Sequence, residues 1–420
     1  MKDYKLHTPE GVRDIIFNEC EEKKELESRI STVFKVYGYK NVQTPTYEYY
    51  EVYSEERGNI DSTKMYKFLD KEGNILVLRP DITPAIARII ATELGNDNDT
   101  IRICYLSNTY RYYDSYQGKL REATQAGVEL VGEESSETDA EVISLAVYSL
   151  LSTGLKEFKI DIGQVQFFKG LLEEANLDEK TGEKLRRLME EKNYIAVEEL
   201  LEKHTIEKSV KQLILDMPKM FGKVEILRKT KKITKNKRSL AALDRLLMIY
   251  DILCDYGIEQ YINFDLGMVN RLNYYTGIIF RGYSYGSGIS ILDGGRYDSL
   301  ISQFGKGKDA VGFGIVINEV QKILKKTDCL IKISLTETVV LYNEDSRKIA
   351  LKIVNKFRTE GMIVEIGMLN KDIESNIEYA KKKGAGGILN FKGENKIEVI
   401  NVIDGNITET TLEELGKEEI

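Results

Sequence analysis

The spacing of apolar residues indicates a body of strands flanked by helices. Apolar residues at intervals of three and four predict helices over 11–38, 83–90 and 138–151. Alternating apolar and polar residues, bounded by turn-forming residues, predict strands over 41–44, 74–78, 101–110, 123–131 and 159–165. A polar loop joins the strands 101–110 and 123–131, so we expect these strands to pair in an antiparallel manner.

The stretch from Phe167 to about Ile258 has a different pattern. It is helical and highly charged, with few turns, and we interpret it as a helical insertion in the sheet domain. It contains a basic run made up of Arg228, Lys229, Lys231, Lys232, Lys235, Lys237 and Arg238. A solvated helix end or loop is the simplest interpretation of this run, and docking onto an acidic partner or RNA is the second one.

Strand spacing returns after the insertion. It predicts strands over 262–265, 276–282 and 288–292, a helix after 294–298, a strand over 310–314 and a helix to about 326. After a polar linker over 325–338, strands over 339–342, 362–366 and 387–391 alternate with helices over 346–359 and 373–383. We therefore predict an α+β chain, with a sheet domain over 1–326, its insertion over about 167–258, and a small α/β domain over 338–420.

Composition and charge exclude several classes of protein. The chain has 420 residues and a net charge of −8, which argues against a surface that binds nucleic acid throughout. The longest apolar stretch, 142–151, is far shorter than the ~18–20 residues that a membrane span needs. The N-terminus lacks the apolar segment of a signal peptide, so we expect a cytoplasmic protein that does not contact the membrane.

Metal centres and catalytic histidine relays have little support. The chain has 2 His, His7 and His204, and its 4 Cys are scattered without a C-x-x-C pair. We expect free thiols, no metal and no cofactor. The string G-x-S-x-G at 282–286 lies in a predicted hairpin rather than in the strand-to-helix turn of a nucleophile elbow, so we assign it no catalytic role.

The stretch 121–129 offers the clearest candidate for a ligand site. With a period of two, one face of this stretch carries Arg121, Ala123, Gln125, Gly127 and Glu129. The small residues leave space for a molecule between polar groups that can bind a carboxylate, an ammonium or an imidazole N–H. The pattern by itself also fits the solvated face of an antiparallel sheet.

Other polar residues suit an amino-acid zwitterion. Asp81, Thr83 and Arg111 lie at predicted helix and strand ends, where Asp81 can pair with an amine. The alternative is that Asp81 and Thr83 cap the helix that follows. The segments 274–277 and 294–298 place glycines beside tyrosines, which permits close backbone approach or simply marks a bulge with core tyrosines.

Together these strings resemble the class II histidyl-tRNA synthetase family. The resemblance covers residues 8 to about 324 and is carried by 11–14, 78–83, 110–125, 274–275, 294–298 and 310–314. It implies a class II synthetase-like antiparallel sheet with flanking helices, followed by an anticodon-binding-like domain. It also implies a set of histidine-binding residues, namely Asp81, Thr83, Arg111, Gln125, Glu129, Tyr274, Tyr275 and Tyr297.

The nucleotide-binding residues of that family are replaced. Tyr113, Asn270 and Glu319 stand where the family has an acidic residue, a catalytic Arg and a second Arg. A cation close to a triphosphate contributes about 4 kcal/mol at ~4 Å and an effective dielectric constant of ~20. At position 319 this attraction becomes repulsion, so we expect no catalytic residues and no use of ATP.

A site that can hold histidine and cannot adenylate it resembles the synthetase-like regulatory subunits of ATP phosphoribosyltransferase. This resemblance implies a role in the first step of histidine biosynthesis, feedback inhibition by histidine, self-dimerisation, and a hetero-octamer with a short catalytic subunit. Alternatives are a divergent histidyl-tRNA synthetase and a paralogue that binds tRNA or histidine. The acidic residues of the C-terminal domain favour a relic or a partner surface over tRNA binding.

Overall fold

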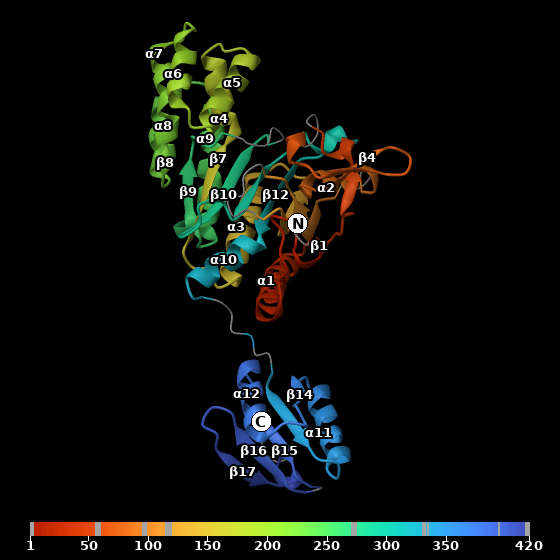
Figure 1. Cartoon of the computed structure of the whole chain (residues 1–420). Coiled ribbons are helices and arrows are strands. Elements are labelled where there is room, and N and C mark those ends of the chain that lie inside the picture. Colours follow the sequence, from red (N-terminus) through yellow and green to blue (C-terminus); the bar gives the residue numbers. More distant parts are fainter. Residues whose placement is uncertain are drawn as a thin grey trace. The chain divides into compact units, whose positions relative to one another are not determined.

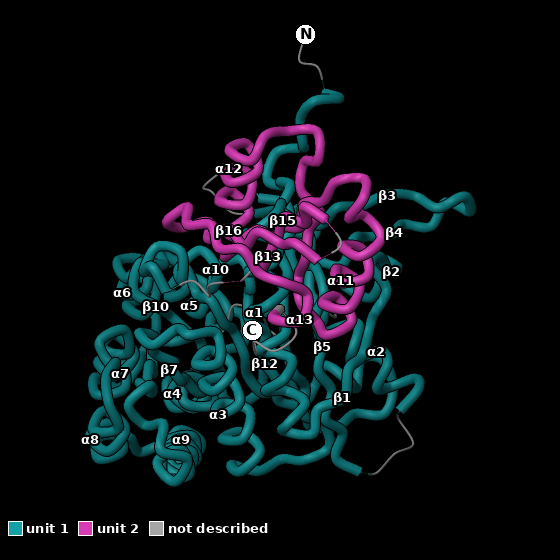
Figure 2. The backbone as a smooth tube through the Cα atoms, turned by 90° about the horizontal axis from the view of Figure 1, so that it is seen from below, with its two compact units in different colours: residues 1–331 teal, residues 332–420 magenta. Residues whose placement is uncertain are grey.

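We examined a computed structural model of the chain. The structure describes residues 4–54, 60–94, 99–113, 120–269, 275–329, 333, 336–393 and 395–415. It divides into compact units that cover residues 1–331 and 332–420 (Figure 2). None of its helices, within these described ranges, has the length and apolar composition of a membrane span.

A long mixed sheet forms the centre of the first unit (Figure 1). Within the described residues its strands follow the order β1 (Lys40–Asn41), β5 (Ile101–Tyr110), β6 (Glu122–Val131), β12 (Ala310–Val316), β11 (Leu292–Arg296), β10 (Ile278–Ser284), β7 (Phe158–Gln164), β9 (Ile262–Asp265) and β8 (Phe221–Gly222). The pairs β1–β5 and β7–β9 are parallel and the other neighbours are antiparallel. The predicted antiparallel pairing of 101–110 with 123–131 is confirmed.

One face of this sheet carries the hydrophobic core. Val128, Phe313, Phe280 and Ile162 lie in one row across β6, β12, β10 and β7, and their side chains are buried. Phe34 packs against Phe313 with ring centroids 6.0 Å apart. Helices that contribute to this core include α1 (Phe17–Val36), α3 (Ser136–Ser152), α4 (Val165–Glu174), α9 (Lys237–Asp255) and α10 (Ile317–Lys326). Because side chains alternate along each strand, the next residues point to the opposite face of the sheet.

The region predicted as a helical insertion is helical. It contains α4, α9 and, between them, α5 (Glu179–Glu190), α6 (Tyr194–Glu202), α7 (Lys208–Asp216) and α8 (Glu225–Ile233). In Figure 1 this yellow and green segment gathers beside β8 and β9. The short strand β8 was not predicted, because two residues carry no detectable alternation.

Shorter elements complete the first unit. A small antiparallel sheet has the order β2 (Tyr47–Tyr49), β4 (Ile75–Leu78) and β3 (Lys67–Leu69), and α2 (Thr83–Thr92) follows it. The 3-10 turns are η1 (Tyr4–Leu6), η2 (Tyr50–Val52), η3 (Ser62–Lys64), η4 (Met217–Lys219), η5 (Glu259–Tyr261) and η6 (Ile301–Gln303).

The second unit is a sheet covered by helices on both faces. Its strand order is β14 (Val364–Ile366), β13 (Thr338–Tyr342), β15 (Gly387–Phe391), β16 (Ile397–Asn401) and β17 (Ile407–Thr410). Helices α11 (Arg347–Thr359) and α12 (Ile373–Lys383) pack into separate cores on its two sides, and α13 (Leu412–Leu415) follows β17. The β-α-β-α-β pattern is confirmed, whereas β16, β17 and α13 were not predicted.

Some predicted boundaries are wrong. The helix predicted over 11–38 begins at Phe17, and the strand predicted over 41–44 is limited to β1. The strand predicted over 288–292 is displaced to β11. The described residues that follow 294–298 contain the 3-10 turn η6 in place of the predicted helix. Gly294 and Gly295 are strand residues paired with both β10 and β12. A Cβ at Gly294 would come within 2.4 Å of the Phe280 side chain, and one at Gly295 within 2.6 Å of the Ile278 carbonyl oxygen. These glycines therefore permit the close backbone approach that was one interpretation of the segment 294–298.

Candidate functional site

A cavity of about 600 Å³ lies on the sheet face opposite the core row. Of the histidine-binding residues that the resemblance implies, the cavity is lined by Asp81, Thr83, Arg111, Gln125, Glu129, Tyr275 and Tyr297. These side chains come from the start of α2, from β5–β6, and from the segments before β10 and after β11. Tyr274 and Asn270 lie outside the described residues.

Glycines of β12 make room for the polar side chains of β6. Gly312 lies opposite Glu129 in the sheet, and a Cβ at Gly312 would come within 1.7 Å of a Glu129 carboxylate oxygen. A Cβ at Gly314 would come within 1.8 Å of the Gln125 amide nitrogen. Any larger residue at these positions would therefore displace the side chains that reach into the cavity.

Glu129 is the most buried acid of the cavity, with an exposed fraction of 1%. Its two carboxylate oxygens accept hydrogen bonds from the Thr83 hydroxyl at 2.9 Å and from the Tyr297 hydroxyl at 2.5 Å. Burial raises the pKa of Glu129 to about 8, the two hydrogen bonds oppose this rise, and the nearby charge of Asp81 adds to it. A ligand that presents an N–H group or a positive charge would stabilise the ionised carboxylate.

Asp81 and Thr83 do not cap the helix, so that alternative is wrong. The N-cap position of α2 is Ile82, and the helix has no side-chain cap hydrogen bond. Asp81 is buried and its carboxylate accepts a hydrogen bond of 2.7 Å from the Ile82 amide. Both side chains therefore line the cavity at the first turn of α2, where the hydroxyl of Thr83 reaches Glu129.

Arg111 and Arg121, two of the arginines that line the cavity, are held differently. Arg111 donates from Nε to the Pro80 carbonyl at 2.7 Å and lines the cavity. Arg121 also lines the cavity, but its guanidinium lies over the Tyr112 ring at 4.5 Å and pairs with Glu10 at 3.6 Å. Arg121 thus connects the cavity to the N-terminal segment. The carboxylate that it pairs with in this structure is that of Glu10.

Tyr105 contributes to the site although it was not predicted. It lies on β5 opposite Gly127, and its hydroxyl accepts a hydrogen bond of 3.3 Å from the Gln125 amide nitrogen. Burial raises the pKa of Tyr105, so the phenol stays protonated near neutral pH. The period-two pattern of 101–110 contained this signal, because a strand paired with 123–131 must place alternate side chains on the same face.

The residue that replaces the family's second Arg lies in the same cavity. Glu319, in the first turn of α10, is largely buried and lines the cavity together with Tyr113. Lys322 pairs with Glu319 at 3.6 Å, and Arg281 of the cavity wall pairs with Asp293 at 3.4 Å. The cavity thus contains the Glu319 carboxylate at the position that the resemblance assigns to the family's second Arg. Among the described His, Cys, Asp and Glu side chains, no group of three or more is arranged to hold a metal ion.

Comparison with known proteins places this geometry in a family. The family model described as histidyl-tRNA synthetase matches residues 11–320. A relative from Acetivibrio thermocellus, named ATP phosphoribosyltransferase regulatory subunit, is 46% identical over 99% of this chain and 100% of its own length. A relative of the same name from Ruminiclostridium cellulolyticum is 42% identical over 98% of both chains. The chain belongs to the family of ATP phosphoribosyltransferase regulatory subunits.

Solved structures agree with this assignment. The crystal structure of an ATP phosphoribosyltransferase regulatory subunit/histidyl-tRNA synthetase from Bacillus halodurans C has a TM-score of 0.81 and 30% identity, and covers 93% of this chain and 99% of its own. Histidyl-tRNA synthetase from Nostoc sp. PCC 7120 has a TM-score of 0.83 at 21% identity, covers 98% of both chains and shows the shared class II fold. The predicted fold class and family resemblance are therefore confirmed.

The second unit is also part of the family. The match to the Acetivibrio thermocellus relative spans 99% of this chain, so it includes the unit over 332–420. Because a regulatory subunit by name carries this region, its presence does not by itself indicate tRNA binding.

Proposed function

We propose that this chain is a non-catalytic regulatory subunit that activates a short catalytic subunit of ATP phosphoribosyltransferase and transmits feedback inhibition by histidine. The relatives' names support the partner, because a regulatory subunit acts on a catalytic one. The proposal places the complex at the first step of histidine biosynthesis in the cytoplasm. It further includes a self-dimer of this chain within a hetero-octamer.

The observation that carries the proposal is the contrast inside one cavity. Asp81, Arg111 and Glu129 offer a carboxylate, a guanidinium cation and a buried hydrogen-bond acceptor to one small molecule. These groups complement the ammonium, carboxylate and imidazole of histidine. Glu319 in the same cavity opposes the phosphates of ATP, so histidine can be bound here without being activated.

In this proposal each half of histidine has its own partners. Asp81 and Thr83 receive the α-amino group, and Arg111 and Gln125 lie around the carboxylate. Tyr275, with Tyr274, encloses the imidazole, whose N–H donates to Glu129. Because Tyr297 and Thr83 already occupy one position on each carboxylate oxygen, the imidazole completes the hydrogen bonding of this buried acid.

Mixing experiments test the proposed activity. We expect phosphoribosyltransferase activity to appear when the chain is added to the short catalytic subunit, and histidine to inhibit this activity. We expect no histidine-dependent ATP–pyrophosphate exchange with the chain by itself. Measurable exchange would contradict the assignment and favour a divergent histidyl-tRNA synthetase, an enzyme whose fold this chain shares.

Substitution of the buried acid tests the proposed histidine site. Glu129→Ala removes the acceptor for the imidazole N–H, so histidine should no longer inhibit the complex at concentrations that inhibit the wild type. Assembly should be retained, as measured by size-exclusion chromatography of the mixed subunits. Unchanged inhibition would place the histidine site elsewhere, for example at the interface of the subunits.

A further inference from the structure

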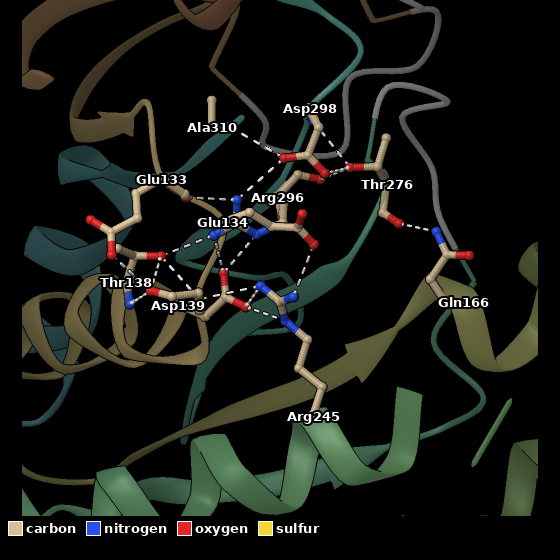
Figure 3. Close-up of polar contacts among 11 residues, drawn as sticks. Glu133, Glu134, Thr138, Asp139, Gln166, Arg245, Thr276, Arg296, Asp298 and Ala310 are labelled. Carbon is tan, nitrogen blue, oxygen red and sulfur yellow. Dashed lines mark hydrogen bonds and ion pairs between the residues drawn. The ribbon is translucent and has the colours of Figure 1, made fainter. Parts of the chain in front are cut away.

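Buried polar side chains adjoin the two segments that carry the pocket tyrosines (Figure 3). Arg296 and Asp298 flank Tyr297 in sequence, and Thr276 follows Tyr275. Tyr297 reaches Glu129, whereas Arg296 and Asp298 contact residues outside the cavity. Thr276 donates to Asp298 at 2.6 Å, so the two tyrosine-bearing segments are joined to each other.

Arg296 is the centre of this group, with an exposed fraction of 1%. Its Nε donates to Asp139 of α3 at 2.9 Å, and its Nη1 donates to Asp298 at 3.2 Å. The same guanidinium also donates to the Glu133 carbonyl at 3.2 Å and to the Thr138 hydroxyl at 3.1 Å. Such a buried pair is costly to desolvate and is stable only when its hydrogen bonds are satisfied, as these are.

The group extends into the helical segment. Arg245 of α9 donates from Nε to the second oxygen of Asp139 at 2.8 Å, so one carboxylate bridges two arginines. Gln166 of α4 donates to the carbonyl of Thr276 and accepts from Arg238 Nε at 2.6 Å. Helix α4 is therefore bonded directly to the segment of Thr276, and α9 is linked to that segment through Gln166 and to the segment of Arg296 through Asp139.

We propose that Arg245, Asp139 and Arg296 are positioning residues that hold Tyr297 on Glu129 and connect the ligand pocket to helix α9. This inference rests on the proposed function, in which the pocket binds histidine. Apolar residues of similar size would pack here with a smaller desolvation cost, whereas a bridged ion pair defines one position of the strand end. Histidine bound in the pocket fixes Tyr297 and, through Arg296 and Asp139, reduces the local unfolding of α9.

A double-mutant cycle on the full chain tests the positioning. Arg245→Gln removes the ion pair between α9 and Asp139 at a side chain that is 22% exposed. Tyr297→Phe removes the hydroxyl that donates a hydrogen bond to Glu129. In urea unfolding, each substitution changes the unfolding equilibrium constant by a measured factor relative to wild type. We expect the factor of the double variant to differ by about threefold or more from the product of the two single-variant factors. Additive effects would overturn the proposal.

Two further variants separate positioning from general stability. Arg187→Gln on α5 removes a charge that is 68% exposed, and its effect should be additive with that of Tyr297→Phe. Arg245→Lys keeps a cation beside Asp139 and should restore part of the coupling to Tyr297. A cycle that is equally non-additive with Arg187→Gln, or a lysine variant as defective as the glutamine variant, would contradict specific positioning.

Hydrogen exchange with histidine tests the connection to α9. In the wild type and in Arg187→Gln, histidine should slow amide exchange in β6, β11 and α9. In Arg245→Gln we expect slowing in β6 and β11 and a loss of slowing in α9. Equal slowing of α9 in Arg245→Gln, or none in the wild type, would overturn the connection. If calorimetry detects no histidine binding, the proposed histidine site fails along with the connection, whereas a non-additive cycle would still support the positioning.

Discussion

Glu129 shows how a residue acquires its chemistry from its surroundings. Its carboxyl is buried between the hydroxyls of Thr83 and Tyr297, and burial raises its pKa to about 8. A glutamate on a solvated sheet face, which the local pattern equally allowed, would titrate near its ordinary value of 4.5. The difference matters for binding, since a pKa near neutrality lets the ligand decide whether the group is ionised.

We predict that this residue makes the stability of the chain fall as pH rises. Between pH values of about 4.5 and about 8 the unfolded chain has released the Glu129 proton while the folded chain retains it. The free energy of unfolding should therefore decrease by up to about 1.4 kcal/mol per pH unit across this window. The melting temperature of Glu129→Gln minus that of wild type should therefore increase as pH rises.

The exposed Glu198→Gln provides the control for this experiment. The Glu198 side chain is exposed, so this variant removes a surface carboxyl and leaves the buried site unchanged. A pH-independent difference from wild type for Glu129→Gln would contradict the raised pKa.

At the scale of elements, the site depends on the pairing of β6 with β12. The polar residues of β6 point into the cavity because glycines stand opposite or beside them in β12. Sequence reasoning associated 310–314 with a family motif, and the structure adds the physical reason for its glycines. It also corrects β11, which was predicted over 288–292 and instead includes the glycines of 294–298, where a Cβ would meet Phe280 or Tyr275.

We predict that Gly312→Ala lowers histidine affinity by roughly tenfold or more, because the new Cβ displaces the Glu129 carboxylate and its hydrogen bonds. Isothermal titration calorimetry with the full chain measures this change. Gly393→Ala is the matched control, since a Cβ at that position meets no atom within 4 Å. Equal affinities for the two variants would contradict the clearance role of Gly312.

At the scale of the whole molecule, the two compact units have separate hydrophobic cores. The core of the first unit includes Phe34 and Phe313, and the cores of the second are centred on β13 and β15. Units with their own cores can unfold independently.

Differential scanning calorimetry of the full chain should therefore resolve two transitions. A chain that ends at Cys329 should retain one of them together with histidine binding. The pocket residues all precede Cys329, so removal of 330–420 leaves the cavity intact. A single cooperative transition for the full chain, or loss of histidine binding on truncation, would show that the second unit stabilises the first.

The sequence by itself determined the period of each major element, the strings that indicated the family, and the candidates Asp81, Gln125 and Glu129. These follow from local patterns, because strand and helix periods and motif order are properties of neighbouring residues. Only the tertiary structure decided that Asp139 pairs with Arg296, 157 positions away. It also decided the raised pKa of Glu129, because burial and the approach of side chains from distant strands exist only after the sheet has formed.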